Sequence, residues 1–156
     1  MRIHRFLICA VLLLSATVLY SDEAEEIRKK LPKLQGEKKL AALGRLHDLS
    51  RENDDYNQQL TCLYAHLNEA RRQGNVEEQC ADLLSRGILF YNYDLDDSLF
   101  YYVRGDMQFL AKHVQWEMCY RLWFSLANTY VYSDSLATGL KEAQTMYEDA
   151  KQHQDV

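Results

Sequence analysis

The stretch WFSLANTY, Trp123–Tyr130, and the later stretch AQTMYEDA, Ala143–Ala150, decide the fold of this 156-residue chain. The first contains the pattern Trp-x2-Leu-Ala-x2-Tyr, and the second contains Ala-x3-Tyr-x2-Ala. On a helix, this spacing places a small residue between bulky ones on one face. The small residue lets two helices approach closely, and the bulky residues fill the gap on either side. We therefore expect two helices that pack as a hairpin.

This pair of patterns is similar to the two halves of a tetratricopeptide repeat, with alanine in place of the usual glycine. Weaker copies occur earlier, as Leu40-x2-Leu43-Gly44-x2-His47 and as Gly105-x3-Phe109. The helices come in couples that recur about every 38–45 residues, as in helical-repeat proteins. We expect an all-α fold of stacked antiparallel helix pairs, an alpha-alpha superhelix, with about three pairs over residues 37–156. A single closed bundle is the alternative.

Apolar residues recur at helical spacing along the whole of this region. The expected helices cover about Glu37 to Arg51, a second segment ending near Gln73, and then segments around Cys80–Tyr91, Phe100–Leu110, Met118–Tyr130 and Leu140–Ala150. Polar breaks separate them at Asn53–Asp55, Gly74–Asn75, Asp94–Asp97, His113–Gln115 and Ser133–Ser135. Gly74 is the clearest stop, because glycine accepts the left-handed conformation that ends helices.

The N-terminus, residues 1–21, is typical of a secretory signal peptide. Basic residues open it, an uncharged run Phe6–Tyr20 follows, and Ser21 precedes an acidic segment. The run is shorter than the roughly 20 apolar residues that a spanning helix needs. Leu19 fits the usual small-residue rule for cleavage poorly, so an uncleaved N-terminal anchor is the alternative. Residues 22–36 are expected to form a short linker or helix.

Composition excludes several classes of protein. The 23 acidic residues outnumber the 18 basic ones, for a formal net charge of −5, which disfavours nucleic-acid binding. An aromatic content of 12% disfavours disorder, and a single proline disfavours a turn-rich β fold. Cys62, Cys80 and Cys119 lie in apolar helical stretches, so we expect small buried side chains there, with a Cys62–Cys80 bridge as the alternative.

No pattern of catalytic or metal-ligating residues stands out. The histidines lack the i, i+4 spacing of a helical zinc pair, and His66 with Glu69 on one helix face is a weak signal. Asp94, Asp96 and Asp97 lack the glycine and distal glutamate of a calcium loop, so helix capping by Asp97 or Ser98 is the better interpretation. We expect no enzyme activity, no cofactor and no metal.

Aromatic residues crowd between Phe90 and Tyr132. Neighbouring rings cannot all face one core, because a helix presents a single apolar stripe. Contacts between stacked pairs would absorb many of them, and others could anchor a peptide. If the first helix of the last pair faces inward, the candidate binding surface is Arg121, Phe124, Asn128 and Tyr132.

Three segments carry a wider resemblance: RGDMQFLAKH at 104–113, SLANTY at 125–130 and MYEDAK at 146–151. The region from Glu37 to Val156 resembles the periplasmic sensor region of Bacteroidetes-type two-component histidine kinases and transcriptional regulators. In that family a signal peptide precedes tetratricopeptide-like repeats, a transmembrane helix, and then a kinase or DNA-binding output domain. This chain stops at Val156 without the last two parts, which predicts a fragment, a truncated product or a stand-alone relative.

The resemblance implies a non-catalytic, exported sensory segment of a membrane signalling protein, located in the periplasm. It would bind a peptide or protein partner on the repeat surface. Membrane attachment would come from an uncleaved N-terminus or a missing C-terminal span. The alternative is a stand-alone exported adaptor or oligomerisation protein. Because Tyr147 lies at the centre of a last helix that lacks a polar cap, we also expect self-association through the C-terminal repeat.

Overall fold

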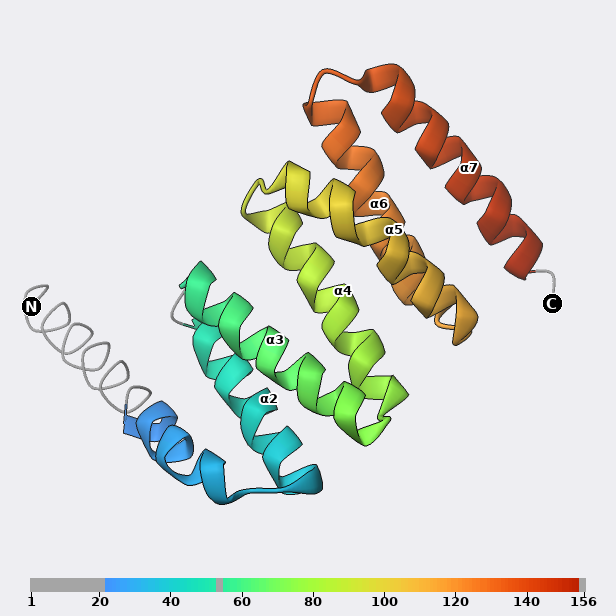
Figure 1. Ribbon diagram of the computed structural model, residues 1–156. Coiled ribbons are helices and arrows are strands. Elements are labelled where there is room, and N and C mark those ends of the chain that lie inside the picture. Colours follow the sequence, from blue (N-terminus) through green and yellow to red (C-terminus); the bar gives the residue numbers. More distant parts are fainter. Residues whose placement is uncertain (1–21, 53–54, 155–156) are drawn as a thin grey trace, which may run out of the picture. The chain divides into compact units, whose positions relative to one another are not determined.

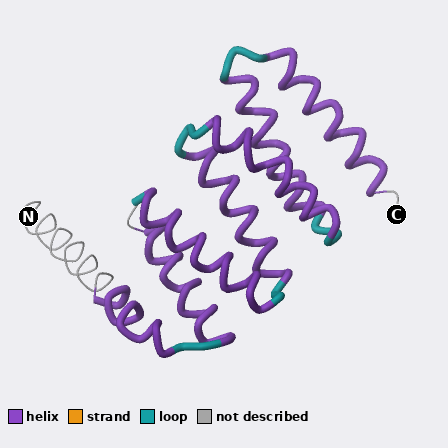
Figure 2. Tube along the Cα trace, viewed as in Figure 1, coloured by secondary structure: helices purple, strands orange, loops and turns teal. Residues whose placement is uncertain are grey.

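A computed structural model describes residues 22–52 and 55–154, and throughout these ranges the chain is helical without a strand (Figures 1 and 2). The expected signal peptide, residues 1–21, lies outside the described residues. The chain consists of two compact units, with the boundary after Cys62. The boundary falls inside one helix.

The N-terminal unit contains a helix at residues 22–30, the short 3-10 helix η1 (Leu31–Lys33), α2 (Gly36–Glu52) and the first turns of α3 (Tyr56–Gln73). Its core joins Leu46 and Leu49 of α2 to Cys62 of α3 and Ala24. Ile27 and Leu31 pack against the same cluster. Residues 22–33 therefore cover one apolar face of α2.

The C-terminal unit continues α3 and adds four helices. They are α4 (Val76–Asn92), α5 (Asp96–Lys112), α6 (Trp116–Tyr132) and α7 (Leu136–Gln154). Helix α4 contacts both α5 and α6, α5 also contacts α6, and α6 contacts α7. Among these described helices α4 and α7 do not pack together, as they would in a closed four-helix bundle. The expectation of an all-α helical-repeat fold is confirmed.

The connecting turns share one geometry. Gly74, Asp94, Val114 and Asp134, twenty residues apart, all have a positive φ, between 52° and 67°. The next residue in each turn donates its N–H to the carbonyl five residues back, at 2.9–3.0 Å. This is the Schellman arrangement of a helix C-terminus. Each chain reversal therefore takes at most three residues, which keeps consecutive helices antiparallel neighbours.

The residues of the Trp-x2-Leu-Ala-x2-Tyr pattern have the packing roles that their sizes predict. Leu126 is fully buried, and Ala127 faces Gly139 of α7. A Cβ added to Gly139 would lie only 2.8 Å from the Ala127 carbonyl oxygen, so α6 and α7 approach very closely here. The indole N–H of Trp123 donates to Glu142 of α7 at 2.8 Å, and the ring of Tyr130 stacks on Phe100 of α5.

The expected capping role of Asp97 or Ser98 is wrong. The N-cap of α5 is Leu95, and no side chain caps this helix end. The three-residue turn places Asp94 in the left-handed region and brings Leu95 directly to the helix start. Asp96 and Asp97 lie in the first turn instead, where their charges act favourably on the helix dipole.

Candidate functional site: a groove along α4 and α6

The four candidate residues lie along one face of α6. Arg121, Phe124 and Tyr132 are exposed, and Asn128 between them is partly covered. Phe124 keeps 56% of its surface accessible and Tyr132 keeps 80%. Large aromatic side chains this exposed are unusual on a helix that otherwise packs against three neighbours.

Helix α4 forms the other side of this surface. Gly87 of α4 has no side chain, and Leu122 of α6 occupies the space beside it. A Cβ at Gly87 would lie 2.3 Å from a methyl carbon of Leu122, so the glycine permits the close approach of the two helices. One helical turn further on, the Asn128 amide donates to the Tyr91 hydroxyl at 3.5 Å. This contact holds the aromatic ring of α4 beside the candidate face of α6.

Two shallow depressions run along this seam, and we call them together the α4–α6 groove. The first has a volume of about 490 Å³ and is mostly apolar; it is lined by Ile88, Tyr91, Asn92, Glu117, Tyr120, Arg121, Phe124, Ser125 and Met146. The second has a volume of about 440 Å³ and is lined by Tyr91, Asn92, Asp94, Asp96, Thr129 and Tyr132. Tyr91 and Asn92 border both, so the groove is continuous past them.

Charge along the groove is uneven. Glu117 and Arg121 lie one helical turn apart in the apolar part, and Asp94 and Asp96 lie beside Tyr132 in the other. Asp96 accepts a hydrogen bond from the Ser133 hydroxyl at 2.7 Å, which joins the start of α5 to the residue that follows α6. The structure thus combines aromatic surface, a guanidinium and carboxylates within one groove.

A buried ion pair holds α4 in place against α5. The guanidinium of Arg86 donates two hydrogen bonds to the carboxylate of Asp106, and each side chain is only 7% exposed. The rings of Tyr102 and Tyr64 lie on the guanidinium, with centroids at 4.5 and 5.8 Å. Burial raises the pKa of the Asp106 carboxyl, and the charge of Arg86 opposes that rise. The pair orients α4, and through it Ile88 and Tyr91.

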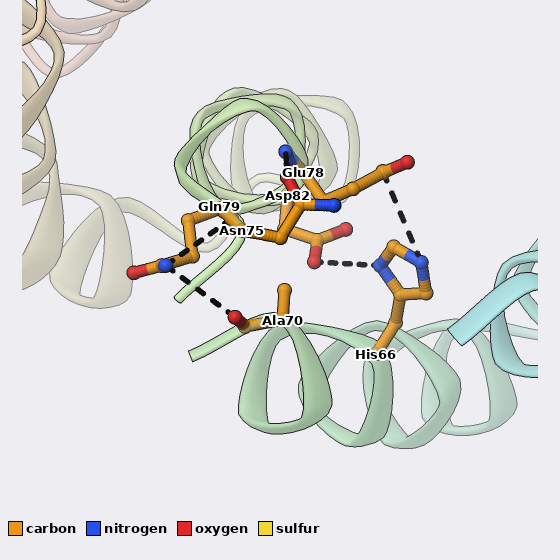
Figure 3. A network of polar contacts seen from close by, with 6 residues as sticks. All are labelled: His66, Ala70, Asn75, Glu78, Gln79 and Asp82. Carbon is orange, nitrogen blue, oxygen red and sulfur yellow. Dashed lines mark hydrogen bonds and ion pairs between the residues drawn. The ribbon is translucent and has the colours of Figure 1, made fainter. Parts of the chain in front are cut away.

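His66 belongs to a polar network between α3 and α4 (Figure 3). Its Nδ1 lies 2.7 Å from the buried carboxylate of Asp82, and its Nε2 lies 3.9 Å from Glu78. Glu69 bonds to Arg72 and Gln73 instead. In the described part of the chain, no cluster of three ligating side chains able to hold a metal occurs.

The same network also caps α4. The Asn75 side chain accepts the Glu78 N–H at 3.2 Å, and the Gln79 amide donates to the carbonyls of Asn75 and Ala70 (Figure 3). These bonds satisfy backbone groups at the junction of two helices. The network accordingly links the end of α3 to the start of α4.

The three cysteines of the described chain are free and buried, so the alternative Cys62–Cys80 bridge is not formed. Burial raises the pKa of each thiol, and that of Cys119 to about 11. A thiol in this state is a poor nucleophile, because the reactive form is the thiolate. The expectation of small buried side chains is confirmed.

The residues singled out from the sequence, Arg121, Phe124, Asn128 and Tyr132, are all on α6, and none was singled out on α4. Ile88 and Tyr91 fit the helical period of the apolar residues in their helix, so the sequence alone does not mark them as part of a groove. Asn92 carries no distinguishing pattern. The spacing of the turns is the signal that could have identified them. Each helix with its turn takes twenty residues, so α4 and α6 occupy equivalent positions in successive helix pairs.

Comparison with known proteins returned no matching family model, no matching curated protein and no matching solved structure. Of the helices in the described residues, none is both long enough and apolar enough to cross a membrane. The groove itself is therefore the main guide to function.

Proposed function

We propose that this chain is a non-catalytic helical-repeat module that binds a peptide or a protein segment in the α4–α6 groove. The observation that carries the proposal is the pair of exposed rings, Phe124 and Tyr132, on the helix face that borders the groove. Binding hot spots are enriched in aromatic and arginine side chains, and Arg121 lies one turn from Phe124. Rings that are already held on a helix lose little conformational entropy when a partner covers them.

The biological setting that we propose is the exported sensory segment of a membrane signalling protein. The signal-like N-terminus and the resemblance to two-component sensor regions support this setting. In it, a partner in the groove would shift the packing of α4 against α6, and the stacked pairs would pass the shift along. Export is tested separately, by fusing residues 1–40 to a phosphatase that is active only outside the cytoplasm. An inactive fusion would contradict export and leave the binding proposal standing.

Peptide binding is tested by selecting a random peptide library on the immobilised protein. The selected peptides are then measured against the Phe124→Ala/Tyr132→Ala variant. We expect affinity to fall at least about 10-fold, the equivalent of 1.4 kcal/mol. The matched control is Tyr101→Ala, because Tyr101 is 79% exposed but lies on α5, away from the groove lining. Equal binding by wild type and the double variant would contradict the proposal.

A further inference from the structure

The outer face of α7 repeats the face with which α5 packs on α6. Leu140 and Tyr147 of α7 follow Phe100 and Met107 of α5 by forty residues, the length of one helix pair. Phe100 stacks on Tyr130 of α6 with ring centroids 4.6 Å apart. The Met107 carbonyl accepts a weak hydrogen bond from the Cys119 thiol of α6. The equivalent α7 positions therefore belong to a helix-packing face.

On α7 this face is uncovered. Met107 is 9% exposed, whereas Tyr147 is 65% exposed; Leu140 is 60% exposed and Leu136 is 56% exposed. We call Leu136, Leu140 and Tyr147 the α7 stripe. Its residues lie at the i, i+4, i+11 positions of a helix surface that meets another helix. The partner that this stripe requires is accordingly an α-helix.

We infer that the α7 stripe is a dimerisation surface, and that its occupant is α7 of a second copy of this chain, running antiparallel. A two-fold axis beside Gln144 would place Leu140 against Tyr147 of the second copy. The same axis would place Lys141 against Glu148 of the second copy, so that two ion pairs flank the apolar contact. Lys141, Gln144 and Glu148 are all exposed. The same two-fold axis thus brings together both the apolar side chains and the oppositely charged side chains of the two copies.

Head-to-tail growth is blocked by the N-terminal unit. Ile27 lies at the same register as Met107 and Tyr147, at a multiple of forty residues, and it packs against Leu46 and Leu49. The face of α2 that could have received α7 from another copy is therefore already covered by its own chain. A surface that pairs only with itself closes as a two-fold dimer rather than growing into a fibre.

The test measures the mass of the full-length protein by sedimentation at protein concentrations from about 1 µM to 1 mM. This range covers the dissociation constants of weak dimers. We expect a monomer–dimer equilibrium whose dissociation constant rises at least about 10-fold in Leu140→Glu. Lys141→Glu and Glu148→Lys should each weaken the dimer, since each places like charges together. The double variant Lys141→Glu/Glu148→Lys should restore the affinity of the dimer. This rescue distinguishes the antiparallel contact from non-specific association. Circular dichroism checks that each variant folds.

Crosslinking tests the axis directly, in a Cys9→Ser background. Gln144→Cys should crosslink efficiently with a short bismaleimide, because the two positions meet at the axis. The matched control, Gln152→Cys, is also exposed, but antiparallel packing separates its two copies by about 24 Å at a rise of 1.5 Å per residue. A monomer throughout the concentration range, failure of the charge swap to rescue, or equal crosslinking at both positions would overturn the inference.

Discussion

Arg86 of α4 and Asp106 of α5 form a two-point ion pair almost completely shielded from water. Neither residue lines the groove, and the pair fixes the helix that supplies Ile88 and Tyr91. A buried charge is stabilising only while its partner is present.

Removal of one member of this pair should be strongly destabilising. We expect Asp106→Ala to lower the free energy of unfolding by about 3–5 kcal/mol, because it leaves the Arg86 guanidinium buried without its carboxylate. Urea unfolding followed by circular dichroism measures the change. The control is Glu25→Gln, which breaks an ion pair between exposed side chains and should leave the unfolding midpoint unchanged. Similar midpoints for both variants would show that the buried pair is not needed.

The glycines of α5 and α7 should respond in opposite directions to replacement by alanine. Gly139→Ala should destabilise the fold by about 1–3 kcal/mol, because the new methyl group would overlap Val131 and the Ala127 carbonyl across a tight helix contact. Gly105→Ala is the matched control: nothing lies within 4 Å of its added Cβ, and it should gain up to about 1 kcal/mol of stability. Thermal unfolding of both variants provides the test, and a loss of stability in Gly105→Ala would contradict it.

Replacement of Val114 by a residue that adopts a positive φ more readily should increase the stability of the fold. It is a β-branched residue at φ 60° and is 70% exposed, so its side chain contributes little packing in return for the strain. We expect Val114→Asn to stabilise the fold by about 1 kcal/mol, because asparagine adopts the left-handed conformation more readily. The reciprocal change, Gly74→Val at the equivalent turn, should destabilise it by a similar amount. Denaturant unfolding that ranks the two variants in the reverse order would refute the assignment.

Tyr120 should make the packing of α7 sensitive to alkaline pH. Burial, and to a smaller extent the hydrogen bond to Asp149, raises the pKa of its hydroxyl to about 12. Because the folded pKa lies above the ordinary value of 10, the stabilising contribution is present below pH 10 and is lost as the pH rises toward 12. Unfolding midpoints measured across this range should fall more steeply in wild type than in Tyr120→Phe. Parallel pH profiles would contradict the assignment.

The period of apolar residues was sufficient to predict the helices and their order. Trp116–Tyr132 and its neighbours lie where that period placed them, and Gly74 ended its helix as expected. The remaining turn geometry was not predictable, since Val114 has a low preference for the conformation that it adopts. Its strain is imposed by the packing of the helices on either side, which no local pattern records.

The candidate site was only half predictable for a similar reason. A single helix face reveals Phe124 and Tyr132, because their spacing is a property of that helix alone. The contact of Tyr91 with Asn128 depends instead on how two helices lie side by side, and that is decided at Gly87 and Leu122. The role of Asp106 was hidden for the same reason, because its partner lies on another helix.

The repeated turns at Gly74, Asp94, Val114 and Asp134 restrict how the chain can change length. Insertion or deletion of a whole forty-residue block keeps every later helix on its proper side of the stack. A block of twenty would exchange the two helices of each pair, and any other length would rotate the following helix away from its contacts. Duplication or deletion of a complete hairpin is therefore the change of length that keeps these helix contacts intact.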